Sequence, residues 1–216
     1  MMNSWQLAGA VLALLLLIYS YPREFIPKLR AEPDYQHFVF ASVVALSLLW
    51  SVQAGIKDGL NLHFLLVTTL VLCHGWRIAC WICLLPMLLL IGFNKLPWQD
   101  AGLFALCSFL LPALFSYSLF LASYRYLNRH LFVYIFVAGF LAAALTMVLK
   151  ISLTALWFGL AGHYSWPEII DNYWVLAILM WFPEALLNGG AITLMAIYRP
   201  HWLRTFNDRE YLSPER

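Results

Sequence analysis

The chain has 216 residues, of which 63% are hydrophobic and only 11% are charged, and its mean hydropathy is +0.76. A water-soluble domain of this size carries roughly 25% charged residues, so the composition excludes such a domain and indicates a chain surrounded by lipid. The formal net charge of +2 is too small to suggest a nucleic-acid partner. We expect a single integral membrane domain over residues 1–216.

Apolar segments separated by short polar breaks run along the whole chain. The first segment lacks the features of a cleaved signal peptide, so we expect a retained helix. Because lipid offers no partner to backbone N–H and C=O groups, spanning segments must be helical. The sequence therefore predicts an all-α polytopic bundle of six to seven transmembrane helices. The segments are Trp5–Tyr21, Phe38–Ala54, Leu60–Cys73, Trp76–Phe93, Ala101–Tyr124, Leu131–Gly162 and Tyr173–Tyr198.

Two of these segments need comment. Leu60–Cys73 rises only ~21 Å as a helix, less than the ~30 Å hydrocarbon core. It is therefore predicted to be short or re-entrant, and whether it and the fourth segment fully span stays open. Pro167 to Asn172 is predicted to be a break before the last helix.

Lys and Arg residues set the predicted orientation. Ten lie in one set of loops, and only Lys57 and Lys95 lie in the other. Positively charged loops stay in the cytoplasm, so we expect the N-terminus outside and the C-terminus inside. The ten are Arg23, Lys28, Arg30, Arg77, Arg125, Arg129, Arg199, Arg204, Arg209 and Arg216.

An intramembrane polar pair is predicted from Lys150 and Glu184. Counted from the outer ends of their helices, Lys150 lies ~18 Å deep and Glu184 ~17 Å deep. Asn188 follows Glu184 by one helical turn on the same face. Two interpretations stay open: an ion pair that fixes helix register, or a cation or proton site.

A first candidate metal site surrounds His63, which we expect to face outward at the mouth of the third segment, with Asp58 nearby. An imidazole suits Ni, Co or Zn. A second, weaker candidate comprises Cys73, His74, Cys80 and Cys83, whose soft ligands suit Cu(I) or Zn. Cysteine in an apolar helix is also a common small hydrophobic residue, so a purely structural interpretation stays open.

No phosphate-binding loop and no nucleophile–base arrangement is visible in the sequence, so we expect a protein that is not an enzyme. Several stretches nevertheless resemble a known family. They are Gly59–Leu65, Leu131–Phe140, Phe182–Gly189 and Tyr198–Arg209. Together they resemble the permease-like proteins of energy-coupling-factor transporters, which are distantly similar to the CbiM-type substrate-binding component of cobalt and nickel importers.

The resemblance implies a bundle of six or seven helices that captures a divalent transition metal as substrate, with no prosthetic group. It implies partners as well, namely a transmembrane coupling subunit and ATPase subunits. In the family the metal is held by the N-terminal amine, a second-position His and a loop His. These positions map to Met1 and His63, whereas Met2 replaces the second-position His.

Two alternatives from other functional classes stay open. The first is a membrane assembly factor or scaffold for a metalloenzyme or respiratory complex. The second is a proton-coupled secondary carrier that uses Lys150 and Glu184.

Overall fold

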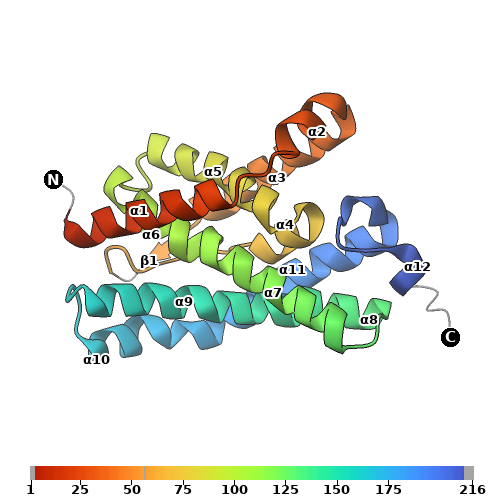
Figure 1. The fold of residues 1–216 in the computed structure, drawn as a ribbon. Helices are drawn as coiled ribbons and strands as arrows, with labels where there is room; N and C mark the ends of the chain where they lie inside the picture. Colours follow the sequence, from red (N-terminus) through yellow and green to blue (C-terminus); the bar gives the residue numbers. More distant parts are fainter. Residues whose placement is uncertain (1–2, 56, 212–216) are drawn as a thin grey trace. The chain divides into compact units, whose positions relative to one another are not determined.

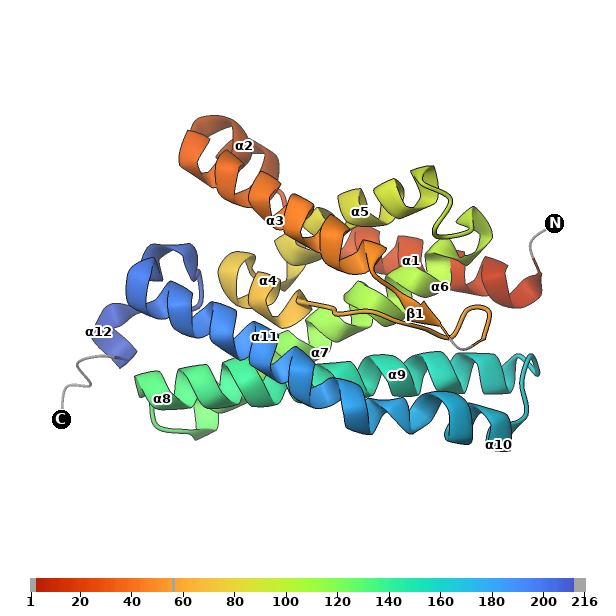
Figure 2. The ribbon, with the colours of Figure 1, turned by 180° about the vertical axis from the view of Figure 1, so that it is seen from behind.

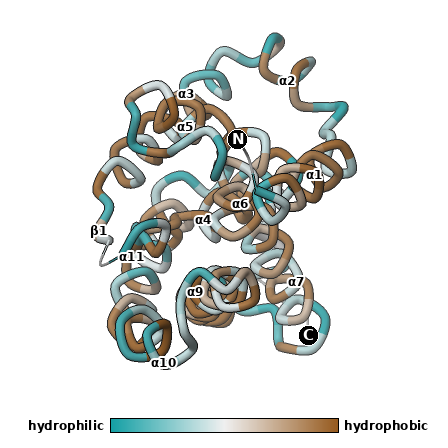
Figure 3. The backbone as a smooth tube through the Cα atoms, turned by 90° about the vertical axis from the view of Figure 1, so that its left-hand side faces the viewer, coloured by the Kyte–Doolittle hydropathy of each residue, from teal (hydrophilic) through white to brown (hydrophobic). Residues whose placement is uncertain are grey.

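The computed structural model describes residues 3–55 and 57–211, which fold into two compact units. Unit 1 lies within residues 1–65 and 77–110, and unit 2 lies within residues 66–76 and 111–216. The all-α prediction is confirmed, since 79% of the described residues are helical and 2% are in strands. Hydrophobic positions run along the helices of both units, and hydrophilic positions lie mainly at helix ends and connections (Figure 3).

Unit 1 holds the N-terminal helices and a small hairpin (Figure 1). Its first helix begins with a capping box, in which Asn3 and Gln6 bond reciprocally through side chain and backbone. Gln6 Nε2 also donates to Asp100 Oδ1 at 2.8 Å. The elements of unit 1 are α1 (Ser4–Tyr19), α2 (Phe25–Ala31), α3 (Pro33–Ser51), β1 (Ala54–Gly55), β2 (Asn61–Leu62), α5 (Trp76–Gly92), η1 (Trp98–Asp100), α6 (Ala101–Ala105) and η2 (Leu106–Leu110).

Unit 2 is built around two long helices, α9 (Ala142–Leu160) and α11 (Leu176–Tyr198), that pack along each other (Figures 1 and 2). Small residues also allow η3 (Tyr134–Leu141), which leads into α9, to approach α11 closely: the Cα of Gly189 lies 3.6 Å from where a Cβ on Gly139 would sit. The elements are α4 (Val67–His74), α7 (Leu111–Tyr126), α8 (Leu131–Val133), η3 (Tyr134–Leu141), α9 (Ala142–Leu160), α10 (Trp166–Ile169), η4 (Ile170–Trp174), α11 (Leu176–Tyr198), η5 (Pro200–Trp202) and α12 (Asp208–Tyr211).

Within the described residues, three continuous helical stretches are long and apolar enough to cross a membrane. They are Trp98–Tyr126, Leu131–Leu160 and Trp166–Tyr198, with 29, 30 and 33 residues. Ser4–Tyr19 and Trp76–Gly92 are apolar but shorter. A total of six to seven spans stays a prediction.

The third predicted segment is not a continuous helix. Residues 60–66 are non-helical, and only the eight residues of α4 are helical. Eight residues rise ~12 Å, too little to cross a ~30 Å core. Gly75 ends α4 with a positive φ of 82°, which glycine adopts without the steric penalty of a Cβ.

The predicted break over Pro167 to Asn172 is wrong, because the last helical stretch already begins at Trp166. Ser165 and Glu168 form a capping box there, and Pro167 occupies the first turn, where its missing N–H costs nothing. A proline that reads as a break in the sequence therefore starts the helix.

Candidate functional site

The N-terminus of α4 is capped by two side chains from α11. The Leu66 N–H donates to Glu184 Oε1 at 2.8 Å. Thr69 donates to Asn188 Oδ1 through its backbone N–H at 3.0 Å and through its hydroxyl at 2.9 Å. The first N–H groups of a helix have no partner within it, so Glu184 and Asn188 satisfy donors that lipid would leave unbonded.

Glu184 and Asn188 are also bonded to each other, one turn apart on α11. Asn188 Nδ2 donates to Glu184 Oε1 at 2.7 Å and to the Glu184 carbonyl at 2.9 Å. Glu184 is 1% exposed. A carboxylate at a helix N-terminus is stabilised by the helix dipole, which offsets part of the cost of burying its charge.

The C-terminus of α4 is capped as well, by the segment that follows α11. The carbonyl of Leu72 accepts bonds from the N–H of Thr205 at 3.2 Å and from its hydroxyl at 2.9 Å. The N–H of Arg204 donates to the Cys73 carbonyl at 3.2 Å, and its guanidinium donates to the His74 carbonyl at 3.3 Å. α4 is thus held at both ends by residues 184–205.

Lys150 lies in α9 and is only 2% exposed. Its ammonium donates to the Tyr173 hydroxyl at 3.2 Å, and its carbonyl accepts from the hydroxyl of Thr154 at 3.0 Å. The structure therefore places Lys150 and Glu184 in one unit, on the packed helices α9 and α11. A direct ion pair between them stays a prediction.

The candidate metal ligand His63 lies in unit 1, directly after β2. Its ring stacks on Phe104, with centroids 5.3 Å apart and planes at 19°, and meets Trp50 edge-on at 5.7 Å. His63 is 3% exposed, and these two aromatic rings pack against it. Its position at the outer mouth of the third segment stays a prediction. Trp50 also fixes the next residues, because its Nε1 donates to the Leu65 carbonyl at 3.3 Å.

The other two predicted ligands of the His63 site are Asp58 and Met1. Asp58 is exposed in the turn of the β1–β2 hairpin, in which Ala54 pairs with Leu62 and Gly55 with Asn61. Met1 lies outside the described residues. The start of α1 and the hairpin lie at the same end of unit 1 in both views (Figures 1 and 2).

The four weaker metal candidates are divided between the two units. Cys73 and His74 end α4 in unit 2, whereas Cys80 and Cys83 lie in α5 in unit 1, and all four are buried. The Cys73 sulfur contacts the Met195 sulfur at 3.5 Å. Among the residues that the structure describes, no three His, Cys, Asp or Glu side chains gather where they could hold a metal ion.

Three of the residues at these sites were missed in the sequence: Thr69, Tyr173 and Trp50. Each interacts with a residue at least 13 positions away in the chain, so no local pattern marks it. Thr69 alone carries a usable signal, a hydroxyl in the first turn of a short helix, where it favours capping.

Comparison with known families decides what this chain is. The family described as the cobalt uptake substrate-specific transmembrane region matches residues 1–202. The chain belongs to this family. The CbiM-type resemblance seen in the sequence is therefore confirmed, and the chain is a membrane protein of metal ion transport. No curated protein and no solved structure matches it.

Membership of the cobalt uptake family fixes the general role of the chain. The family consists of components of cobalt transport systems, which generally work with other subunits, and this implies a role other than catalysis.

The family match ends at residue 202. Arg204 and Thr205, which cap the C-terminus of α4, therefore lie beyond the matched region.

Proposed function

We propose that the protein is the substrate-capture subunit of an uptake system for a divalent transition metal ion, cobalt or nickel rather than copper or zinc. The observation that carries the proposal is the family match over residues 1–202. The metal is the transported substrate. The protein lies in the bacterial inner membrane as a single domain, N-terminus outside, and works with a transmembrane coupling subunit and ATPase subunits.

His63 and the N-terminus are the proposed metal ligands. Two features of unit 1 support this assignment: the imidazole is held by Trp50 and Phe104, and α1 starts at the hairpin end of the unit (Figures 1 and 2). Since Met2 replaces the His of the family pattern, the N-terminal amine and His63 carry a larger share of the binding. Imidazole and amine nitrogen are suitable ligands for Co²⁺ and Ni²⁺.

Calorimetric titration of the full chain in nanodiscs with Co²⁺, Ni²⁺, Zn²⁺ and Cu²⁺ tests the proposal. We expect binding of cobalt or nickel and its loss in His63→Ala. His37→Ala is the matched control, because His37 is exposed on α3 in the same unit. No binding of any of the four ions, or equal binding by His63→Ala and the control, contradicts the proposal.

A second candidate function is proton-coupled transport through Lys150 and Glu184. Two buried charged side chains on packed helices favour it, because such groups in a membrane commonly mark proton or ion routes. Uptake of radioactive cobalt by cells at several pH values separates the candidates. If Glu184→Gln leaves uptake and its pH dependence unchanged, the second candidate is lost.

A further inference from the structure

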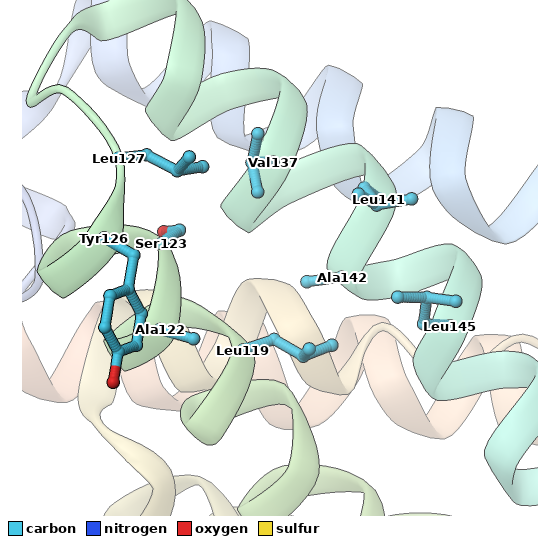
Figure 4. Close-up of a pocket in the computed structure, with 9 residues that line it drawn as sticks. All are labelled: Leu119, Ala122, Ser123, Tyr126, Leu127, Val137, Leu141, Ala142 and Leu145. Atoms are coloured by element: carbon cyan, nitrogen blue, oxygen red, sulfur yellow. The ribbon is translucent and has the colours of Figure 1, made fainter.

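Unit 2 carries a groove of about 250 Å³ between α7 on one side and η3 and α9 on the other. Its walls are aliphatic (Figure 4). Leu119, Ala122 and Leu127 come from α7 and the residue after it, and Val137, Leu141 and Leu145 come from the facing stretch. None of these walls offers a hydrogen-bonding side chain, so the groove suits an apolar occupant.

One end of the groove differs from the rest. Ser123 and Tyr126 line it there, near the C-terminus of α7. Ser123 is satisfied by the Phe120 carbonyl at 3.0 Å, whereas Tyr126 is 77% exposed. The guanidinium of Arg125 lies 5.6 Å from the centroid of the Tyr126 ring, so a positive charge stands beside the polar end.

Arg125 is available to an outside anion. No ion pair found among the described residues includes it, whereas the nearby Arg129 bonds to Glu210 at 3.3 Å. Basic loop residues also predict that this end of α7 faces the cytoplasm. Basic pockets between transmembrane helices on the cytoplasmic side bind anionic lipid headgroups, and each Lys or Arg near the surface contributes about 1 kcal/mol.

The length of the groove favours an acyl chain over a partner helix. Leu119 to Leu127 spans ~12 Å along the helix axis, close to one leaflet of a ~30 Å hydrocarbon core. A spanning helix instead packs along the full core, commonly on a seam of small residues. Four of the nine lining residues are leucines, and the groove is much shorter than a spanning helix.

We propose that this groove binds an anionic phospholipid, with one acyl chain between α7 and η3–α9 and the phosphate held by Arg125. The ligand is a resident lipid of the leaflet at the C-terminal end of α7. The proposal does not depend on metal capture, because none of the residues that form the groove is a proposed metal ligand.

Native mass spectrometry of the full chain in detergent tests the site. The probes are dioleoyl phosphatidylglycerol and dioleoyl phosphatidylcholine, which share their chains and differ in headgroup charge. One basic residue near the surface corresponds to about a fivefold preference for the anionic lipid. Arg125→Gln should remove that preference, lowering the binding of phosphatidylglycerol more than that of phosphatidylcholine. Arg23→Gln, an exposed arginine of unit 1, should keep it.

A second pair of variants tests the apolar part of the groove. Ala122→Phe fills it from an exposed position and should lower the binding of both lipids. Leu121→Phe adds similar bulk at the neighbouring exposed position, which does not line the groove, and should change neither. Equal binding of both lipids by the unaltered protein overturns the proposal. The proposal is also overturned if Arg125→Gln keeps the preference for the anionic lipid, or if Ala122→Phe binds both lipids as well as the unaltered protein does.

Discussion

Glu184 accepts a hydrogen bond from the backbone N–H of Leu66 at 2.8 Å, although the two residues lie 118 positions apart in the chain. Leu66 has φ of 55° and ψ of 11°, a left-handed conformation. For a residue other than glycine this conformation costs roughly 1–2 kcal/mol. The buried carboxylate offsets that cost, because it bonds the N–H group that opens α4.

Replacing Glu184 should therefore destabilise the fold of unit 2. Glu184→Leu leaves the Leu66 N–H without its acceptor and removes one of the two bonds that Asn188 Nδ2 donates. Each unsatisfied buried donor costs about 1–3 kcal/mol. We expect the free energy of unfolding, measured by denaturant titration in micelles, to fall by ~3 kcal/mol. Hydrogen exchange at residues 66–69 should accelerate at the same time.

Thr193→Val is the matched control for Glu184. Among the described residues, the Thr193 hydroxyl bonds only to the Gly189 carbonyl of its own helix, at 2.7 Å. That variant should stay within ~0.5 kcal/mol of the unaltered protein. If Glu184→Leu is no less stable than Thr193→Val, the carboxylate does not hold α4.

The adjacent glycines of α11 should respond in opposite directions to the same substitution. A Cβ on Gly189 would collide with the ring of Phe140, whereas a Cβ on Gly190 meets nothing within 4 Å. Gly189→Ala should therefore lower stability by about 1–3 kcal/mol through overpacking. Gly190→Ala should be neutral or raise stability by up to ~1 kcal/mol, because alanine favours helix. Melting temperatures of the two variants compare them directly, and equal values would contradict the packing of η3 on α11.

Trp50 should influence metal affinity, if His63 binds the metal as proposed. Trp50→Phe keeps a ring against His63 and removes the N–H that donates to the Leu65 carbonyl. Loss of such a supporting bond typically weakens metal binding 10- to 100-fold, so we expect a Kd at least ~10-fold higher by calorimetry.

Trp81→Phe is the control for Trp50. The Nε1 of Trp81 has no hydrogen-bond partner among the described residues, and its ring meets Tyr21 instead. If the unaltered protein binds no metal, the proposed function is wrong. If it binds metal and both tryptophan variants bind equally well, only the role of Trp50 is wrong.

Tyr211 should make the C-terminal segment sensitive to alkaline pH. The ring of Tyr211 contacts Tyr134 and Phe206. This burial is the main reason why the pKa of Tyr211 is raised to about 12. The unfolded chain releases this proton near pH ~10, so the folded state binds it more tightly. The contribution of Tyr211 to stability is therefore complete below pH ~10 and is lost as pH rises to ~12.

Melting temperatures measured between pH 8 and 12 check this prediction. The fall above pH ~10 should be smaller in Tyr211→Phe, which has no proton to lose. Tyr126→Phe, at an exposed position, should follow the unaltered protein. Identical pH profiles for all three proteins would show that Tyr211 does not anchor the segment.

Local hydropathy and capping account for the part of the fold that was predictable. The long helices over Leu131–Leu160 and Leu176–Tyr198 follow from unbroken apolar runs, because lipid forces backbone hydrogen bonds to form within the segment. The start at Trp166 was missed although its signal is local. Ser165 and Glu168 have capping-box spacing, and Pro167 suits a first turn as well as a break.

The sequence by itself determined that this is a helical membrane protein with Lys150, Glu184 and Asn188 inside apolar segments, because solvent preference is a property of each residue. Only the tertiary structure decided what these groups bond. Glu184 and Asn188 serve α4 because residues 60–66 are not helical and leave its first N–H groups unpaired. His63 is enclosed because folding brings Trp50 and Phe104 to it. Partners this distant in the chain are chosen by packing, which no local pattern encodes.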